Sequence, residues 1–218
     1  MCVREGLDRE DFMSKHIRKA LLPLIVVVSI VSGAIGQGTR PPSEELRVRK
    51  FVGIGNKGTV FTPSYSTDVG GGVKRAQEWQ SFRLSYDTAP EWIDELLIQF
   101  FVLGMTRDPE TKRNVYSLYK VAVRYVDIQA GRNHMAMAFL RPTALKRYGP
   151  VVAAAAVVTL DGAVVAEVSE EDVELPEKWW ENPRVTDSAA TTIRDGYLLH
   201  RGKSPWALIN PDDYEVIK

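Results

Sequence analysis

The sequence is poor in the residues that most often carry out catalysis or bind metals. It has 218 residues with one cysteine, Cys2, and three histidines. One cysteine cannot close an internal disulfide, and neither His134 nor His200 has a second ligand at a metal-site spacing. Zinc-protease and serine-hydrolase motifs are absent as well. We therefore expect no cofactor, no metal and no enzymatic activity.

Net charge is also lacking, because 28 basic residues balance 28 acidic ones and the pI is near 6.9. A chain without excess positive charge is a poor candidate for binding nucleic acid through phosphates. The hydrophobic fraction of 44% and the charged fraction of 26% are those of an ordinary globular protein. The composition predicts a folded domain with no nucleic-acid partner.

A long apolar run occurs once, at Ala20–Ile35. It follows a basic patch made of Lys15, His16, Arg18 and Lys19. Small residues then stand two apart at Ala34 and Gly36, which is typical of a cleaved secretory signal peptide. We predict that residues 1–36 are an N-terminal extension and signal peptide, with Met13 as the working start. The mature protein would lack cysteine and would be exported to the periplasm, the outer-membrane surface or the medium.

An uncleaved anchor is the alternative interpretation of the same run. Uncharged sequence extends from Ala20 to Thr39, about the 20 residues that a spanning helix needs. Pro23, Ser29 and Gly33 dilute its apolar character. Membrane contact would then be limited to this N-terminal segment.

Alternating apolar and polar residues dominate the rest of the chain, after a Pro/Gly-rich linker at 37–45. The predicted strands are Ser81–Asp87, Glu95–Leu103, Val115–Val126, Met135–Leu140 and a hairpin over Val151–Val168 that turns at Asp161-Gly162. Seven to nine such strands predict an all-β antiparallel sandwich over residues 46–169.

The segments between these strands are rich in turn residues. We predict turns at Asp87–Pro90 and Gln129–Asn133, and short helical turns at Glu91–Leu96 and Thr143–Tyr148. Residues 170–218 are predicted to be an irregular C-terminal segment that packs on the sandwich, with an edge strand at its end, Tyr214–Ile217.

Two glycine-rich segments resemble phosphate-binding motifs. Gly53–Gly58 has the letters of a dinucleotide fingerprint, but no helix pattern follows it, so it is predicted to be a turn between strands. Asp68–Val73 lacks the Lys-Ser/Thr of a P-loop and is expected to be a loop. The acidic stretch Glu167–Glu177 lacks calcium-site spacing and is expected to be solvated.

Tryptophan offers the only binding candidates. Exposed tryptophans stack on sugars or anchor protein partners. Trp179 and Trp180 are adjacent and point to different sides, so at least one is expected to be exposed unless the tail is covered on both sides. Trp92 is the third candidate. We predict binding through Trp179, Trp180 and Trp92.

Several segments resemble a family of secreted verrucomicrobial proteins, namely Tyr148–Val151, Asp161–Glu167, Leu175–Pro183, Asp195–Leu199 and Asn210–Ile217. Members of that family are encoded beside type IV pilus-like machinery and have an immunoglobulin-like β-sandwich. The resemblance implies an immunoglobulin-like antiparallel β-sandwich with an irregular C-terminal extension, and a cell-envelope or pilus-associated role. Because the apolar run precedes the expected cleavage site, an accessory or surface component fits better than a pilin.

Three functions are compatible with these patterns. The leading hypothesis is a secreted protein that contacts envelope or pilus-assembly proteins. The alternative is a glycan-binding module that uses the tryptophans. A carboxylate-based hydrolase also remains open, because the separation of its paired acids is spatial and leaves no sequence motif.

Overall fold

The computed structural model describes residues 45–62, 65–66 and 73–207. These residues all belong to one compact unit, Thr39–Lys218. The predicted signal peptide, most of the linker at 37–45, the Asp68–Gly72 loop and the predicted edge strand at Tyr214–Ile217 lie outside the described residues. Within them, no helix is both long enough and apolar enough to cross a membrane.

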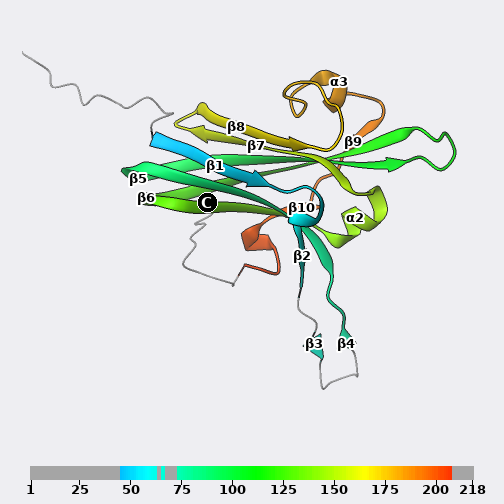
Figure 1. The fold of residues 1–218 in the computed structure, drawn as a ribbon, viewed down its shortest axis with the longest axis horizontal. Helices are drawn as coiled ribbons and strands as arrows, with labels where there is room; N and C mark the ends of the chain where they lie inside the picture. Colours follow the sequence, from blue (N-terminus) through cyan, green and yellow to red (C-terminus); the bar gives the residue numbers. More distant parts are fainter. Residues whose placement is uncertain (1–44, 63–64, 67–72, 208–218) are drawn as a thin grey trace, which may run out of the picture. The chain divides into compact units, whose positions relative to one another are not determined.

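Strands make up most of the described chain, and the all-β class is confirmed (Figure 1). One sheet contains β1 (Leu46–Val52), β2 (Thr59–Phe61), β5 (Glu78–Arg107), β6 (Asn114–Leu140), β7 (Val151–Leu160), β8 (Ala163–Glu171), β9 (Thr191–Ile193) and β10 (Leu198–His200). A second sheet has two strands, β3 (Tyr65–Ser66) and β4 (Val73–Lys74). The helices are short: α2 (Pro142–Tyr148), α3 (Pro183–Thr186) and the 3-10 turns η1 (Gly55–Lys57) and η2 (Arg201–Lys203).

The hydrogen-bonding order of the main sheet is β10-β6-β5-β7-β8, and β1 and β2 pair with β5 beside this path. The eight strands of the main sheet therefore form an open sheet, and an immunoglobulin-like pair of sheets is not confirmed. The predicted hairpin at Asp161-Gly162 is confirmed as the β7–β8 connection, with positive φ at both residues. The helical turn predicted at Thr143–Tyr148 corresponds to α2.

Two pairs of predicted strands are each a single long strand. Ser81–Asp87 and Glu95–Leu103 belong to β5, and Val115–Val126 and Met135–Leu140 belong to β6. The turns predicted between them are wrong, and so is the helical turn at Glu91–Leu96, because this chain is extended. The turn residues mark a bend in a continuous hairpin.

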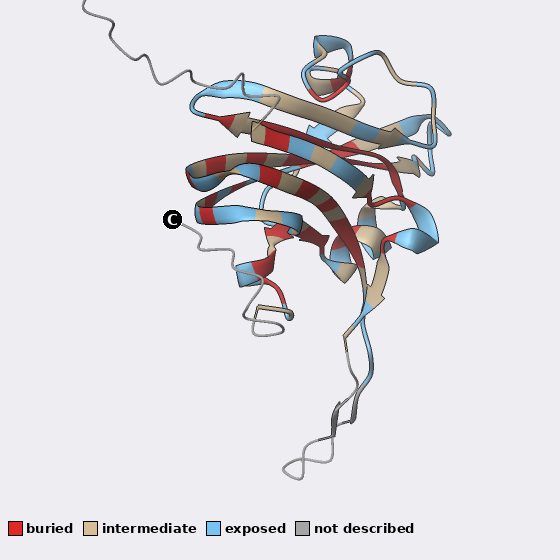
Figure 2. Cartoon of the chain, turned by 60° about the vertical axis from the view of Figure 1, so that its left-hand side comes forward, coloured by how far each residue is buried: buried red, intermediate tan, exposed pale blue. Residues whose placement is uncertain are grey.

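At this bend the pairing of β5 with β6 is irregular. Between the pairs Thr88↔Gly131 and Trp92↔Gln129, three residues of β5 oppose one residue of β6. Asn133 also has a positive φ of 62°, a backbone conformation typical of bulges. Figure 2 shows the two paired strands turning back here, so that the two halves of the hairpin face each other.

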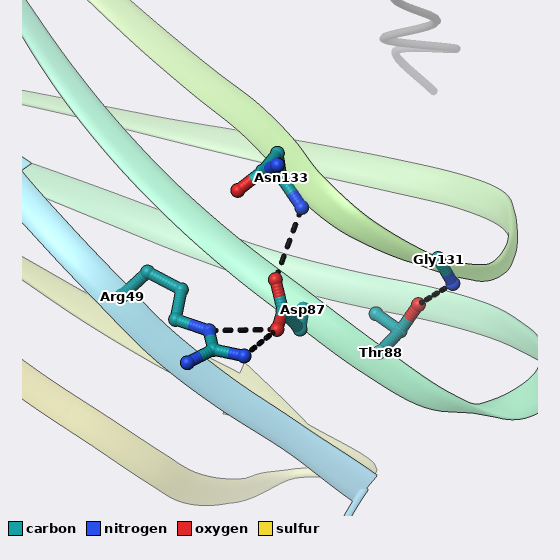
Figure 3. A network of polar contacts seen from close by, with 5 residues as sticks. All are labelled: Arg49, Asp87, Thr88, Gly131 and Asn133. Atoms are coloured by element: carbon teal, nitrogen blue, oxygen red, sulfur yellow. Dashed lines mark hydrogen bonds and ion pairs between the residues drawn. The ribbon is translucent and has the colours of Figure 1, made fainter.

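Polar contacts hold the bend in place (Figure 3). The Asp87 carboxylate accepts hydrogen bonds from the Arg49 side chain at 2.7 Å and from the Asn133 N–H at 3.0 Å. The Thr88 hydroxyl donates to the Gln129 carbonyl and accepts from the Gly131 N–H, both at 3.0 Å. Two adjacent β5 side chains therefore replace the ladder hydrogen bonds that the irregular pairing removes.

The main core lies on the concave face of the folded hairpin. Its members come from both halves, with Phe82, Leu84 and Tyr86 before the bend and Ile98 and Phe100 after it. A second cluster covers the opposite face of β7, which explains why every residue from 151 to 158 is buried. As predicted, the apolar stretch 95–103 is a central strand, paired on both sides.

The C-terminal segment is more regular than expected. β9 pairs in parallel with β6, and β10 pairs antiparallel with β6 farther along. The Trp206 ring stacks on Phe139 with centroids 4.6 Å apart and meets Trp79 edge-on at 5.5 Å. Residues after β8 thus complete the sheet and cover part of its outer face.

Thr88→Val removes the hydroxyl at the bend while keeping the side-chain volume. It leaves the Gly131 N–H and the Gln129 carbonyl without this partner, so we expect a loss of about 1–3 kcal/mol in the free energy of unfolding. Urea denaturation measures this loss. The control Thr159→Val, in β7, should change stability by less than about 0.5 kcal/mol. Equal stability of the two variants would show that the Thr88 hydroxyl does not hold the bend.

Asp87→Asn tests the ionic part of the same bend. The Arg49 side chain, followed by the Asn133 N–H, lowers the pKa of Asp87 below its ordinary value. A carboxylate with a lowered pKa stabilises the fold above its unfolded pKa of about 3.9, and this contribution is lost as the pH falls through the folded value. We expect wild type to melt above Asp87→Asn at pH 7 and the gap to narrow as the pH falls below about 3.9. A gap independent of pH would contradict this.

Candidate functional site: two pockets and an exposed tryptophan

Trp179 and Trp180 are both buried, so the expectation that one of them is exposed is corrected. Their side chains are 1% and 5% exposed and pack edge to face with centroids 5.8 Å apart. They lie in the second cluster, against the outer face of β7 and its neighbours. The Trp179 indole N–H donates to Glu171 at 3.1 Å. Neither ring presents a free face to a sugar or a partner, because the tail folds over this side of the sheet.

Trp92 has the opposite environment. It lies in β5 at the bend, opposite Gln129, and 54% of its surface is exposed. Since its neighbours are fixed by the Asp87 and Thr88 contacts, the indole projects from a rigid corner. Of the three tryptophans predicted to bind, Trp92 is the one that the structure leaves accessible.

A pocket of about 420 Å³ lies at the same corner, and we call it the corner pocket. It is lined by Glu45, Arg47, Arg49, Asp87, Thr88, Ala89, Ala130, Gly131 and Arg132. Trp92 comes three residues after Ala89 in β5. It pairs with Gln129, which precedes Ala130 in β6. Arginine and tryptophan are the residues most enriched where proteins bind partners. Sequence reasoning missed the three arginines, although the alternation Leu46-Arg-Val-Arg49 placed two of them on one face of β1.

The charges of the corner pocket are partly paired. Arg49 forms an ion pair with Asp87 at 2.5 Å and is held against β5. Arg132 lies close enough to contribute to the lowered pKa of Asp87. The fixed Asp87 carboxylate and the three guanidinium groups give this corner a mixed charge suited to hydrogen bonding with polar groups of both signs.

The glycine-rich segment Gly53–Gly58 forms the predicted turn between β1 and β2, with η1 inside it. The Glu170 carboxylate of β8 accepts from the N–H groups of Gly53 at 2.9 Å and Ile54 at 3.1 Å. Successive backbone N–H groups of this kind form an anion-binding nest. Here the chain's own carboxylate occupies the nest, so the motif serves to tie β1 to β8.

A second pocket, the base pocket, has a volume of about 410 Å³ and lies beside this turn. It is lined by Gly55, Asn56, Thr59, Glu78, Gln80, Pro142, Leu145, Lys146, Pro150 and Val151. The Gln80 amide donates to the carbonyls of Gly53 at 2.5 Å and Gly55 at 2.9 Å, which fixes the wall formed by the turn. The opposite wall is α2. This pocket is preformed, and its lining combines four aliphatic residues with polar and charged side chains.

A tyrosine cluster lies away from both pockets. The Arg194 guanidinium stacks over the Tyr148 ring at 3.6 Å, and its Nε donates to the Ser117 hydroxyl at 2.9 Å. Burial raises the pKa of Tyr119, beside this cluster, to about 12. Tyr119 is therefore neutral at physiological pH. These contacts fix the segment between α3 and β10 to β6.

The acidic residues of β8 have structural partners. Glu170 binds the turn, Glu171 accepts from Trp179, and Glu167 pairs with Lys178 at 2.5 Å. Within the described residues, no group of three or more histidine, aspartate or glutamate side chains is placed to hold a metal ion. The absence of enzymatic activity stays a prediction.

Comparison with known proteins places the chain in a family. A protein-family model matches residues 58–218. The chain belongs to that family. A crystal structure of a protein from Akkermansia muciniphila matches with a TM-score of 0.62 and 23% identity, over 80% of this chain and 93% of that chain. It shows that the two share a fold and agrees with the verrucomicrobial resemblance. No curated protein matches the chain.

The two kinds of tryptophan should respond differently to truncation. Trp179→Ala empties a fully buried site, so we expect a loss of about 3–5 kcal/mol in the free energy of unfolding. Trp92→Ala removes a half-exposed side chain and should cost less than about 1 kcal/mol. Chemical denaturation of both variants checks this. Equal losses would contradict the assignment of Trp92 as an accessible surface residue.

Proposed function

We propose that the protein is an exported cell-envelope component without catalytic activity that acts by contacting other proteins. The observation that carries the proposal is the bend, where Trp92 is half exposed and Arg47, Arg49 and Arg132 line the adjoining corner pocket. A half-exposed tryptophan is costly to leave in water, and here it follows a backbone segment fixed by hydrogen bonds. A rigid surface of this composition binds with little loss of conformational freedom.

The place of action is inferred from the sequence. The basic patch, apolar run and small residues before position 37 are typical of an exported protein. The verrucomicrobial resemblance favours a partner in type IV pilus-like machinery, with the protein as an accessory or surface component. Periplasm, outer-membrane surface and medium all agree with these features.

A matched pair of variants tests the corner. Wild-type protein bound to a resin is incubated with envelope extract from its own organism, and retained proteins are identified by mass spectrometry. We expect an envelope or pilus-assembly protein to be retained by wild type and by Ile193→Ala, which truncates an exposed apolar residue in β9. Trp92→Ala should retain at least tenfold less.

Recovery of the protein with no envelope partner in every extract would contradict the proposal. Equal retention by Trp92→Ala and wild type would show that the partner binds another surface. Thermal melting of each variant confirms that the fold is intact before the comparison is made.

Glycan binding is the second candidate, and Trp92 is the observation that favours it. An exposed indole face stacks on a sugar ring, and the arginines of the corner pocket can bind its hydroxyl or acidic groups. A glycan array on which wild type binds and Trp92→Ala does not would support this function. An empty array would remove it. Trp179 and Trp180 are excluded from this role by their burial.

A further inference from the structure

The described residues 59–62, 65–66 and 73–80 form a hairpin arm that leads from β2 to the start of β5. Its described pairs are Thr59↔Gln80, Val60↔Trp79 and Phe61↔Glu78, and β3 pairs with β4 farther along. A two-stranded hairpin is only marginally stable in water unless another surface covers it. Phe61, on this arm, is 60% exposed, more than any other large apolar residue in the described chain.

One edge of β2 has no strand beside it within the described residues, where β2 pairs with β5 alone. The Thr62 N–H donates to Gln77, and the Ser81 N–H donates to Gly58. Because antiparallel pairs alternate, the N–H and C=O groups of Thr59 and Phe61 point away from β5. These two residues therefore offer unpaired backbone groups along an open edge.

This edge lacks charged side chains, one of the usual protections, although the strand has three residues and Pro63 follows it in the sequence. Open edges are normally blunted by charged side chains, proline or bulges. β8, the edge at the other end of the sheet path, has a bulge between its pairs with Val158 and Thr159, and its Glu167 is bound to Lys178. The β2 edge, Thr59-Val-Phe-Thr62, carries no charge. An uncharged edge can accept another strand along these three residues.

The arm also carries an apolar side chain and a pocket on one face. Thr59, Phe61, Glu78 and Gln80 share a face because they alternate along paired strands. Thr59, Glu78 and Gln80 line the base pocket, whereas Phe61 lies two residues, or about 7 Å, farther along the arm. Phe61 is thus placed beside the base pocket of its own chain but outside it.

We propose that a second copy of this chain docks on the arm, with the two β2 strands pairing antiparallel about a two-fold axis at Val60. In this register Phe61 of the second copy stands directly opposite Thr59, at the rim of the base pocket. Thr59 of one copy pairs with Phe61 of the other, and the backbone groups of both residues point away from β5. Hydrogen bonds between the two β2 strands can therefore form. A surface that carries both the inserted side chain and its pocket is self-complementary, as a two-fold contact requires.

The lining of the base pocket favours this occupant over a sugar. Pro142, Leu145, Pro150 and Val151 provide aliphatic contacts, the other side chains are polar or charged, and no lining residue is aromatic. A phenylalanine ring can pack on the aliphatic part, and each copy supplies one. The inference goes beyond the proposed function, because it concerns a different surface and a different partner.

Light scattering of the purified protein at increasing concentration tests the inference. We expect wild type to reach twice the chain mass of 24.4 kDa, or twice that of the chain as processed, by about 100 µM. Phe61→Ser removes the inserted ring and Thr59→Arg blocks the pocket rim, so each should weaken dimerisation at least tenfold. Ile193→Ser and Thr192→Arg make the same changes in β9 and should leave it within twofold.

A designed disulfide tests the register separately. Val60 would meet its own copy across the axis in a non-hydrogen-bonded pair with a Cα separation of about 4.5 Å, which a disulfide spans. In a Cys2→Ser background, Val60→Cys should form a covalent dimer on mild oxidation, whereas Val164→Cys, exposed in β8, should not. A wild-type monomer at all concentrations, or dimers unaffected by both arm variants, would overturn the inference and leave the Trp92 test unaffected.

Discussion

The bend in the β5–β6 hairpin is the constraint on which the rest of the structure depends. Two strands of 30 and 27 residues would have to curve around a core or expose their apolar face if they were regular. Asp87 and Thr88 stabilise an irregular pairing instead, so both halves contribute to one core. The Thr88 hydroxyl donates its one proton to Gln129 and must accept from its other partners, which makes the nearby His134 Nε2 a donor at 3.2 Å. Each polar group at the bend then has a defined role.

The last strand of the sheet path, β8, is linked to the turn after β1 by Glu170. Its carboxylate binds two backbone N–H groups more than 110 residues away, at the turn after β1. The same turn is held from β5 by Gln80 and by the Ser81 hydroxyl, which donates to the Gly58 carbonyl at 2.9 Å. The bonds from Glu170 and those from Gln80 and Ser81 all act on this one short turn. The same bonds that connect the strands therefore also make this wall of the base pocket rigid. The likeness to a glycine-rich nucleotide loop has the same origin, since both need backbone N–H groups free to bind oxygen.

Strand positions could be predicted from the sequence, but their connections could not. Alternation at Ser81–Asp87 and the Asp161-Gly162 turn gave correct elements, because side-chain period and turn chemistry are local. The sequence predicts turns at Asp87–Pro90 and Gln129–Asn133, because aspartate, proline, glycine and asparagine suit turns and bulges equally well. These two segments form a bend in continuous strands because they pair with each other across β5 and β6, and that pairing is not visible in the sequence. The burial of Trp179 and Trp180 was equally hidden, since it depends on how the tail crosses β7.

The two candidate surfaces are far enough apart to act independently. Phe61 lies opposite Glu78 at the start of β5, and the bend begins at Asp87, nine residues later. At 3.3 Å per residue the strand between them spans about 30 Å. A second copy on the arm would therefore form its strand pairs about 30 Å from the bend and its corner pocket. Two identical corners held at a fixed separation would bind a repeated or two-fold partner with an effective concentration far above that of a single site. The uncharged β2 edge, Thr59–Thr62, and the arginine-rich corner also differ in chemistry, so neither surface competes for the partner of the other.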